Sequence, residues 1–444
     1  MNNDAQAGTS VKPPPRAVVL GGYGLIGAAC LRALKSAGFT VTGVGRDADA
    51  ARRVDPNGDW LIRDIARTTA ADWAHDLAGI DVVVNASAAL QDGARDDLAP
   101  IHEGAIKALI DGLGDQKTRF IQISAVGVAL DAPTAFMSTK ARGNAKLMNS
   151  TLDWIVLRPT LVLGRAAYGG TALLRAAAAM PLIGFQVLPD TPVQTIALDD
   201  LAAAVVQAAS GDIPTGTLAD VTSADVHTFA SLTNQIRGWL GFAPWRFTIT
   251  VPQPLLTLTG KIADGLGWVG WRSPFRSTAL NVLADGIKGD PAAWHAAGGA
   301  ACRSLDQTLR DMPATLQDRW FSRLFLLLPV AIATLALFWM LSGLIGLART
   351  GPAIEVLTSR GIDAGVASFA VIGGGVIDVA LGTAILFRRY ARRACGAMIA
   401  VSLGYLAAGT LLTPDIWVDP LGPFVKVLPG IVLAGMVMAL MDDR

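Results

Sequence analysis

The chain is short of charged residues. Asp, Glu, Lys and Arg make up 16% of its 444 residues, whereas hydrophobic residues make up 52%. This composition is too apolar for a protein that is soluble throughout, so part of the chain is predicted to lie in a lipid bilayer. The net charge of +1 leaves no basic surplus to neutralise phosphates, and nucleic acid is excluded as a partner.

Cysteine and histidine are also scarce. Cys30, Cys302 and Cys395 lie far apart without a CxxC pair, and the four histidines show no ligand spacing. Neither a disulfide framework nor a metal site is predicted. Residues 1–15 lack an apolar stretch before a cleavage site and are rich in Pro and polar residues, which predicts a disordered cytoplasmic tail.

Charge is absent altogether from residues 324–347. At a rise of about 1.5 Å per residue, a helix of this length crosses a hydrocarbon core of about 30 Å. Three further spans are predicted at 365–387, 394–413 and 424–441. The alternative is a set of buried helices in a large soluble protein. Four spans place both chain ends on one side of the membrane.

The arginines near these spans predict the orientation. Arg319, Arg323 and the four arginines of 388–393 would face the cytoplasm, whereas the opposite loops carry only Arg349 and Arg360, with acidic neighbours. We therefore expect an inner-membrane protein whose N-terminal domain and C-terminus are cytoplasmic.

Glycine is concentrated in one turn near the N-terminus, "GGYGLIG" at 21–27. A β-branched strand at 17–20 precedes it, and a helix and a second strand at 40–44 follow. This context predicts a dinucleotide-binding turn, in which backbone N–H groups approach a pyrophosphate at a helix N-terminus. The alternative is a merely structural strand–turn–helix. The predicted cofactor contacts in the turn are Gly21, Gly22, Tyr23, Gly24, Leu25, Ile26 and Gly27.

The residue type at the end of the second strand bears on the cofactor. Arg46 stands where an acidic residue would bind the ribose of NAD, and a guanidinium suits a 2′-phosphate. NADP(H) is therefore favoured over NAD(H). The alternative is a solvated Arg46 with Asp47 binding the ribose.

Further strand ends carry candidate site residues. Asp64, followed by Ile65, could accept a hydrogen bond from the adenine amine, and the small residues Ala86 and Ser87 would let the cofactor pass close to the backbone. Ser124 ends another buried strand. Strands that alternate with helical segments predict an α/β Rossmann-type, doubly wound parallel sheet covered on both faces.

The order of these motifs resembles the atypical branch of the extended short-chain dehydrogenase/reductase (SDR) family, and within it the nucleotide-binding accessory subunit of respiratory complex I. The resemblance is carried by "GGYGLIG", Asp64, Ser124 in "ISAVG", Lys140 in "FMSTK", "LRPTLVLG" at 157–164 and "TIALDDLAAAV" at 195–205. It implies an NAD(P)-binding domain over 16–245, with substrate-side segments from about 165, and catalytic roles for Ser124 and Lys140.

One position departs from the family pattern. Phe136 stands where the family has a tyrosine four residues before the lysine, and phenylalanine cannot donate a proton. Tyr168, after a strand predicted at 155–163, is a possible substitute or else a loop aromatic beside the cleft. Lys140 can still bind the nicotinamide ribose, or act alone as acid or base. Ser124 either orients a substrate carbonyl or caps the sheet end.

The C-terminal part, 321–444, resembles the DoxX-like membrane family through its four-span layout and "PDIWVDPLGPFVKVLP" at 414–429. This resemblance implies quinone-linked electron transfer. Residues 246–320 are predicted to form substrate-side helices and a connector.

An apolar stripe lies within this connector. Between 251 and 271 it comprises Leu255, Leu258, Ile262, Leu266 and Val269. The stripe predicts either domain core or a helix on the bilayer surface with Trp268 and Trp271 at headgroup depth.

One acidic residue falls inside a predicted span. Asp378 lies near mid-bilayer on the same face as Gly375 and Gly382, so its carboxyl is predicted to point into the helix bundle. Lys426 is either its partner or snorkels to the surface.

The combined expectation is a membrane-anchored NADP(H)-dependent reductase that passes hydride to a lipophilic acceptor, either a quinone or an isoprenoid carbonyl. The alternative is a catalytically silent NAD(P)H-binding scaffold or sensor of a membrane complex. Sugar-nucleotide epimerisation is disfavoured because that chemistry depends on the missing tyrosine.

Overall fold

The computed structural model describes residues 13–89, 97–271, 273, 275–420 and 422–441. Most of the tail predicted at 1–15 lies outside the described residues. The chain forms two compact units: unit 1 comprises Met1–Lys261 and Pro274–Leu316, and unit 2 comprises Ile262–Ser273 and Gln317–Arg444.

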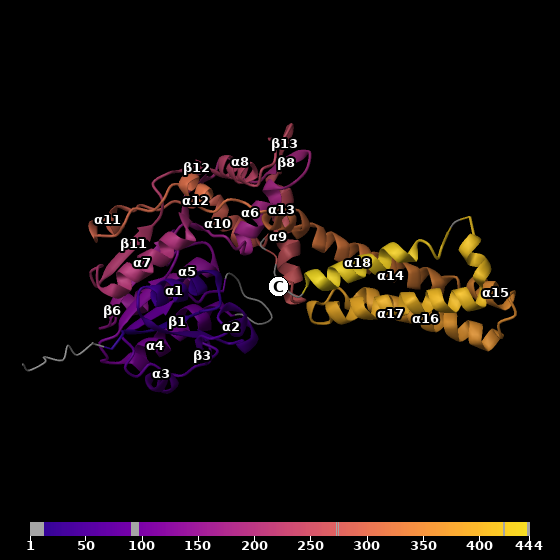
Figure 1. The fold of residues 1–444 in the computed structure, drawn as a ribbon, viewed down its shortest axis with the longest axis horizontal. Helices are drawn as coiled ribbons and strands as arrows, with labels where there is room; N and C mark the ends of the chain where they lie inside the picture. Colours follow the sequence, from indigo (N-terminus) through magenta and orange to yellow (C-terminus); the bar gives the residue numbers. More distant parts are fainter. Residues whose placement is uncertain (1–12, 90–96, 272, 274, 421, 442–444) are drawn as a thin grey trace, which may run out of the picture. The chain divides into compact units, whose positions relative to one another are not determined.

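A parallel sheet of seven strands forms the centre of unit 1 (Figure 1). Its strands are β1 (Arg16–Leu20), β2 (Thr40–Gly45), β3 (Asp59–Ile62), β4 (Val82–Asn85), β5 (Arg119–Ile123), β6 (Asp153–Pro159) and β11 (Thr217–Val221). Their order is β11-β6-β5-β4-β1-β2-β3. The order reverses between β1 and β4, and ligands of doubly wound sheets bind at such a switch point.

Helices cover both faces of the sheet because alternate residues of its strands point to opposite sides. Ala17 and Val19 pack in one core with α1 (Leu25–Ser36) and α7 (Leu198–Ser210). Val18 and Leu20 pack in another core with α3 (Ala70–Asp76), α4 (Ala105–Leu113) and α5 (Ala135–Met148). The predicted α/β Rossmann-type fold is therefore confirmed.

The strand predicted at 155–163 is interrupted at Thr160. β6 stays in the large sheet, whereas β7 (Leu161–Leu163) leaves it and pairs with β10 (Thr195–Ala197). The prediction of one continuous strand was wrong. The residues on both sides of Thr160 are apolar, so the sequence does not show that the chain changes from the large sheet to a pair with β10. From this point the chain builds a separate lobe of unit 1.

The lobe has its own core and two further strand pairs. Leu163, Leu174, Leu232, Leu305 and Leu309 are among its buried residues. Its elements are α6 (Gly169–Ala178), β8 (Ile183–Gln186), β9 (Pro192–Val193), β12 (His227–Thr228), α8 (Phe229–Trp239), β13 (Phe247–Thr250), α10 (Ser277–Ala284) and α12 (Leu305–Asp311). The strand pairs are β8 with β13 and β9 with β12. The remaining elements of unit 1 are α2 (Ala48–Val54), the π-helical η1 (Pro100–Gly104) and α11 (Ala292–Ala296).

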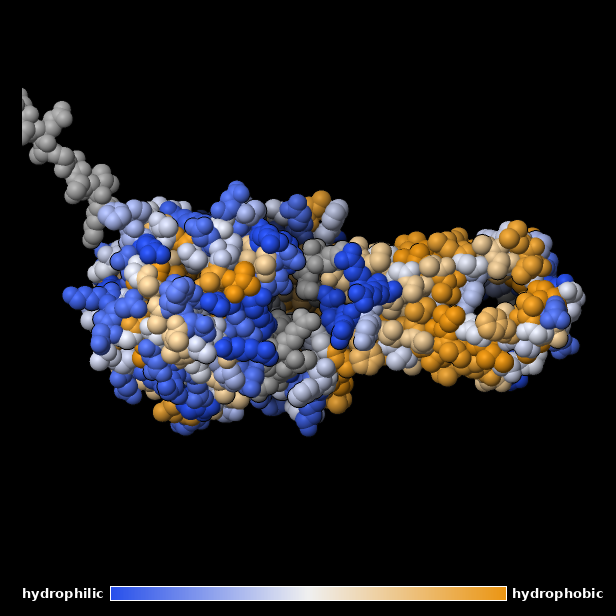
Figure 2. All heavy atoms as spheres, turned by 90° about the horizontal axis from the view of Figure 1, so that it is seen from below, coloured by the Kyte–Doolittle hydropathy of each residue, from blue (hydrophilic) through white to orange (hydrophobic). Residues whose placement is uncertain are grey.

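Unit 2 is helical. It contains α14 (Leu327–Ala348), α15 (Thr350–Thr358), α16 (Ala364–Ala384), α17 (Arg388–Leu412), the 3₁₀ turn η2 (Pro414–Val418) and α18 (Val427–Leu440). Most of α13 (Leu316–Phe325) and the end of α9 (Gln253–Trp268) also belong to it. Figure 2 shows hydrophobic residues over most of the visible surface of the helices.

Among the described residues, α14, α16 and α17 are long and apolar enough to cross a membrane. The fourth span was predicted over 424–441, but α18 has only 14 residues. Its helix begins later because residues before Val427 form turns, so at about 1.5 Å per residue it is shorter than a hydrocarbon core of about 30 Å.

Candidate functional site

The glycine turn packs tightly against the end of β4. Gly21 has φ +70°, and a Cβ there would lie 2.9 Å from the Cα of Ser87 and 3.1 Å from the carbonyl oxygen of Ala86. A Cβ on Gly27 would clash with the carbonyl oxygen of Gly21. Only glycine fits these two positions, and the packing brings the turn, the start of α1 and the switch point together.

The N-terminus of α1 presents backbone N–H groups at this turn. Gly24 is the N-cap residue; among the described residues no side chain caps the helix, and its first turn has no acidic residue. Leu25 and Ile26 direct their side chains toward the core beside α7. The N–H groups of a helix start without a side-chain cap, with the positive end of the helix dipole, favour an anion.

The next part of the turn borders the end of β2. Gly22 donates its N–H to the carbonyl oxygen of Val44 at 3.0 Å, and the ring of Tyr23 lies against Gly45. Arg46 follows and is exposed.

The side chain of Asp47 binds backbone N–H groups of the residues that follow it. Its Oδ1 accepts the N–H groups of Asp49 and Ala50 at 2.9 and 3.0 Å and so caps α2. The hydrogen bond from Ala50 is the main cause that holds the pKa of Asp47 below its usual value.

Asp64 lies two residues after β3. Its Oδ1 accepts the N–H of Ala66 at 3.1 Å, and its Oδ2 is 3.8 Å from Nε of Arg67. Ile65 packs at the edge of the core below it. The carboxylate is therefore held at the same edge of the sheet as the glycine turn.

A run of hydrogen bonds along the carboxyl ends of β4 and β5 connects Lys140 to Ser87, which packs against Gly21 of the glycine turn. Ser87 donates its N–H to Oδ1 of Asn85 at 3.1 Å, and Nδ2 of Asn85 donates to Oε1 of Gln122 at 2.9 Å. Nε2 of Gln122 and Nζ of Lys140 both donate to the carbonyl oxygen of Ile123, at 3.4 and 3.1 Å. The lysine is thus held at the end of the strand next to β4.

Lys140 lies in an apolar setting. Its side chain is buried, and its Nζ is 5.8 Å from the centre of the Phe136 ring. Burial lowers the pKa of Lys140 to about 8. An ammonium with three donors, a lowered pKa and a place at the strand ends can both donate hydrogen bonds and exchange a proton near neutral pH.

His102 was missed by the sequence analysis. Its ring packs edge-on against Phe136 with centroids 5.6 Å apart. Thr139 donates its hydroxyl to Ala135, so Nδ1 of His102 donates to Thr139 at 2.8 Å, while Nε2 accepts the N–H of Ala89 at 3.3 Å. Burial, together with the charge of Lys140, lowers the pKa of His102 to about 3, so this ring is neutral. Nothing in the sequence spacing identifies it.

Ser124 has a partner that sequence reasoning also missed. Its Oγ accepts a hydrogen bond of 2.7 Å from Nδ2 of Asn144, which lies one turn after Lys140 on α5. Oδ1 of Asn144 is buried and has no partner among the described residues. The four-residue spacing of Phe136, Lys140 and Asn144 was the available signal, because it places all three on one face of a helix.

Tyr168 is the N-cap residue of α6, and 64% of its surface is exposed. Its role as a substitute for the missing tyrosine stays a prediction.

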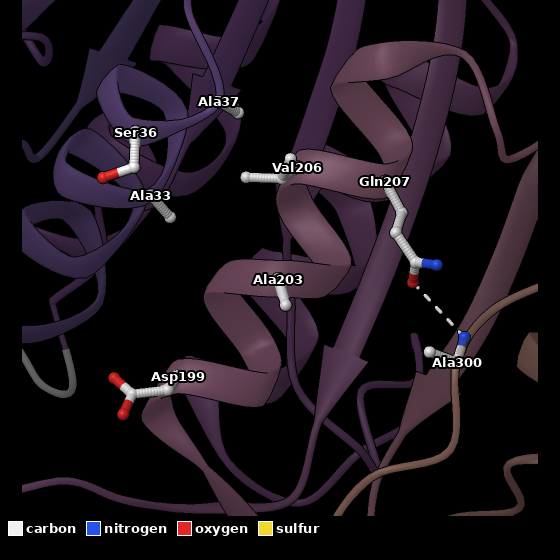
Figure 3. Close-up of a pocket in the computed structure, with 8 residues that line it drawn as sticks. All are labelled: Ala33, Ser36, Ala37, Asp199, Ala203, Val206, Gln207 and Ala300. Atoms are coloured by element: carbon white, nitrogen blue, oxygen red, sulfur yellow. Dashed lines mark hydrogen bonds between the residues drawn. The ribbon is translucent and has the colours of Figure 1, made fainter.

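A separate hollow lies between α1 and α7 (Figure 3). It is lined by Ala33, Ser36, Ala37, Asp199, Ala203, Val206, Gln207 and Ala300. The α1 residues among them belong to the C-terminal end of that helix, whereas the glycine turn is at its N-terminal end. This hollow is therefore not part of the site at the strand ends.

Inside unit 2, Asp378 is buried together with Gly375 and Gly382 on α16, which agrees with the prediction that it points into the bundle. It accepts hydrogen bonds from Oγ of Ser342 at 3.3 Å and from the hydroxyl of Tyr405 at 3.1 Å. Lys426, the other candidate partner, is exposed at the start of α18.

A parallel sheet with a glycine turn at its switch point defines a nucleotide-binding protein of the Rossmann type, here joined to apolar helices. Residues 21–210 match the NAD(P)H-binding family, and residues 336–435 match the DoxX-like family. The chain thus combines an NAD(P)H-binding domain of Rossmann-type fold with a DoxX-like domain and is membrane-associated. A comparison with curated proteins finds no match.

Solved structures of similar fold include the Bordetella bronchiseptica enzyme WbmG in complex with NAD, with 17% identity, a TM-score of 0.54 and coverage of 71% of this chain and 97% of that chain. A putative epimerase from Burkholderia cenocepacia has 18% identity, a TM-score of 0.52 and coverage of 70% and 99%. The terminal R domain from the myxalamid PKS-NRPS pathway has 14% identity, a TM-score of 0.52 and coverage of 71% and 91%. At such identities the similarity concerns the fold.

Proposed function

We propose that the protein is a membrane-anchored oxidoreductase that uses NADP(H) and transfers hydride to a lipophilic acceptor, either a quinone or an isoprenoid carbonyl. The observation that carries the proposal is the burial of Lys140 at the strand ends, where hydrogen bonds through Gln122 and Asn85 lead to Ser87 beside the glycine turn. Burial disfavours a charged ammonium, so an apolar side chain would fill this place at lower cost if packing were the only role of the residue. The presence of lysine therefore supports a chemical role.

The cofactor would lie across the switch point. The N–H groups at the start of α1 would hold the pyrophosphate, and the close approach of Gly21 to Ser87 would let the nicotinamide half pass over β4. Asp64 would accept from the adenine amine. Arg46 would bind the 2′-phosphate, which is supported by the use of Asp47 as a helix cap.

When bound, the cofactor supplies the hydride. Lys140 would hold the nicotinamide ribose through an ammonium hydrogen and donate a proton to the acceptor oxygen, since its pKa of about 8 lies near ambient pH. Ser124, positioned by Asn144, would orient that oxygen. Neutral His102 would keep Phe136 in place without adding a second positive charge beside Lys140.

The lipophilic acceptor is supported by the attached helices. A DoxX-like domain follows the nucleotide domain in the same chain. Along the sequence, only the short helix α13 lies between the last residue of unit 1 and α14. An acceptor dissolved in the bilayer is thus available where the protein resides. We place the protein in the inner membrane with the nucleotide domain in the cytoplasm, on the basis of its arginine distribution.

A catalytically silent NAD(P)H-binding scaffold of a membrane complex is the second candidate, and Phe136 is the observation that favours it. The same residue argues against epimerisation, although one structural neighbour is described as a putative epimerase.

The test is NADPH oxidation by the full-length protein in mild detergent with a panel of quinones and prenyl carbonyls. We expect oxidation with at least one acceptor, and Lys140→Met to lower its rate by roughly 10²–10⁴-fold. Because the ammonium is the active form, the rate should fall as pH rises through about 8, and this dependence should disappear in the variant. Tight NADPH binding without oxidation of any acceptor would leave the scaffold as the function.

A further inference from the structure

Helix α9 turns an apolar row away from the protein. Leu255, Leu258, Ile262 and Leu266 are 49%, 54%, 55% and 44% exposed. The face that packs inward is formed by Leu256, Gly260 and Ala263 instead. The interpretation of the stripe as domain core was therefore wrong, because a second and smaller set of residues at helical spacing supplies the buried face.

The row has the pattern of a helix that lies in a membrane interface. Its members recur at intervals of three and four residues, so they form a continuous stripe. Thr257 and Lys261, which are also exposed, occupy a different side of the helix. A stripe of four large aliphatic side chains beside a polar side is typical of interfacial helices, and it is unusual on a surface that faces only water.

The turn after α9 packs on the start of α17 and the end of α16. Trp271 donates its Nε1–H to the carbonyl oxygen of Leu386 at 2.6 Å, and its ring packs beside the core of the apolar helices. Val269 accepts the N–H of Arg388 at 3.2 Å, and the Arg388 guanidinium is 5.6 Å from the Trp271 ring. All these residues belong to unit 2.

Leu386 and Arg388 mark a membrane boundary, because α16 ends just before them and the arginine-rich start of α17 follows. Tryptophan is enriched at such boundaries. Trp268 is 72% exposed, but it lies seven residues after Lys261 and therefore on the polar side of α9, not on the row. Exposed Arg389 and Arg393 at the same boundary favour anionic headgroups.

We propose that α9 is an interfacial helix whose row of Leu255, Leu258, Ile262 and Leu266 is covered by lipid at the boundary between headgroups and acyl chains. The partner is the bilayer itself and not another protein, because the turn that directly follows the helix packs through Trp271 on the part of unit 2 that would meet the membrane surface. Helix α9, whose residues are divided between the two units, thereby contributes a lipid contact separate from the spans. This contact is independent of the proposed chemistry.

Site-directed spin labelling of the full-length protein in nanodiscs that contain anionic lipid tests the proposal. Single cysteines are introduced by Leu258→Cys and Ile262→Cys on the apolar row and, as matched controls, by Thr257→Cys and Lys261→Cys on the polar side. The parent protein is the blank, since Cys30 and Cys395 are buried and Cys302 is partly buried.

We expect labels at 258 and 262 to collide more often with oxygen and less often with a water-soluble nickel chelate than labels at 257 and 261. Equal access of the chelate to all four labels would show that the row faces water and would overturn the proposal. Protection of 258 and 262 from both reagents would overturn it too, because protein and not lipid would then cover the row. If a first-set variant does not fold, Leu255→Cys on the row and Gln253→Cys, which is exposed one turn before Thr257, repeat the comparison one turn earlier.

Discussion

At the scale of single residues, the site depends on side chains whose neighbours fix their protonation and direction. Asp47 is committed to capping α2, Lys140 is kept at a lowered pKa by burial, and His102 is kept neutral between Thr139 and Ala89. These constraints leave Arg46 and Lys140 as the positive groups that we expect to meet the cofactor.

Replacement of Arg46 tests the choice of coenzyme. Arg46→Ala should weaken NADPH binding by roughly 10–100-fold, because one charge-assisted hydrogen bond to a phosphate contributes about 1.5–3 kcal/mol. NADH binding should change little. Calorimetry with both coenzymes measures the difference, and Arg53→Ala, an exposed arginine on α2, is the control. An equal loss for both coenzymes would contradict the assignment.

Restoring the missing hydroxyl tests the site for latent chemistry. Phe136→Tyr places a phenol beside Lys140, since the ring centre is 5.8 Å from Nζ. If the site is a reductase site, carbonyl reduction should rise by roughly 10²–10⁴-fold over the parent protein. NADPH oxidation with small carbonyls measures it. Unchanged coenzyme binding without any turnover in the variant would instead fit a scaffold.

Sequence spacing could identify some site residues and not others. Glycines at fixed intervals after a strand, and Lys140 four residues after Phe136, are local patterns that one sequence displays. His102 and Gln122 join the site only through contacts between distant segments, which no local period records. Asn144 could be predicted in part. Its spacing from Lys140 places it on the same helix face, but its hydrogen bond to Ser124, 20 residues away in the chain, could not be predicted.

At the scale of elements, α14 and α16 show how small residues allow close packing of apolar helices. A Cβ on Gly343 would lie 2.5 Å from the carbonyl oxygen of Gly375, and a Cβ on Gly382 would lie 2.9 Å from the carbonyl oxygen of Ala336. Backbones can approach this closely only where side chains are missing. Asp378 lies on the same face of α16, so its carboxylate is directed between helices.

The hydrogen bonds of Asp378 should stabilise this packing. Asp378→Leu removes the acceptor for Ser342 and Tyr405, and each hydroxyl left unpaired in the hydrocarbon of the membrane or detergent costs about 1–3 kcal/mol. Asp378→Asn keeps an acceptor, so it should lower the unfolding temperature in detergent less than Asp378→Leu does. Intrinsic fluorescence during heating measures both.

Asp415→Asn is the control for this comparison. Asp415 pairs with Arg360 on the surface, and exposed pairs contribute little. If Asp378→Leu proved as stable as this control, the polar cluster would not be a stabilising feature.

At the scale of the whole molecule, the two units could be predicted because they differ in composition. Long apolar runs indicated α14, α16 and α17, and alternation of strands and helices indicated the parallel sheet. The stripe of α9 was predicted, but the sequence could not decide between a buried and an exposed row, and the change of partner between β6 and β7 was not predicted at all. Each depends on which neighbouring segment packs against an apolar surface. The order of apolar and polar residues within one segment does not show which other segment will pack against it.

Membrane orientation is a prediction at this scale. Arg389→Cys and Ser359→Cys place exposed thiols at opposite ends of α16. In intact spheroplasts, a membrane-impermeant maleimide should label position 359 and should label position 389 only after permeabilisation, because arginine-rich segments stay cytoplasmic. The parent protein gives the background from native cysteines. The reverse pattern of labelling would place the nucleotide domain outside.

The interleaving of the two units has a consequence for biosynthesis. Unit 1 needs α12 for its core, since Leu305 and Leu309 are buried there, and it ends only at Leu316. The first span follows at Leu327. The first hydrophobic segment therefore leaves the ribosome directly after the final helix of unit 1, so we expect the membrane-insertion machinery to bind the nascent chain while unit 1 is still folding.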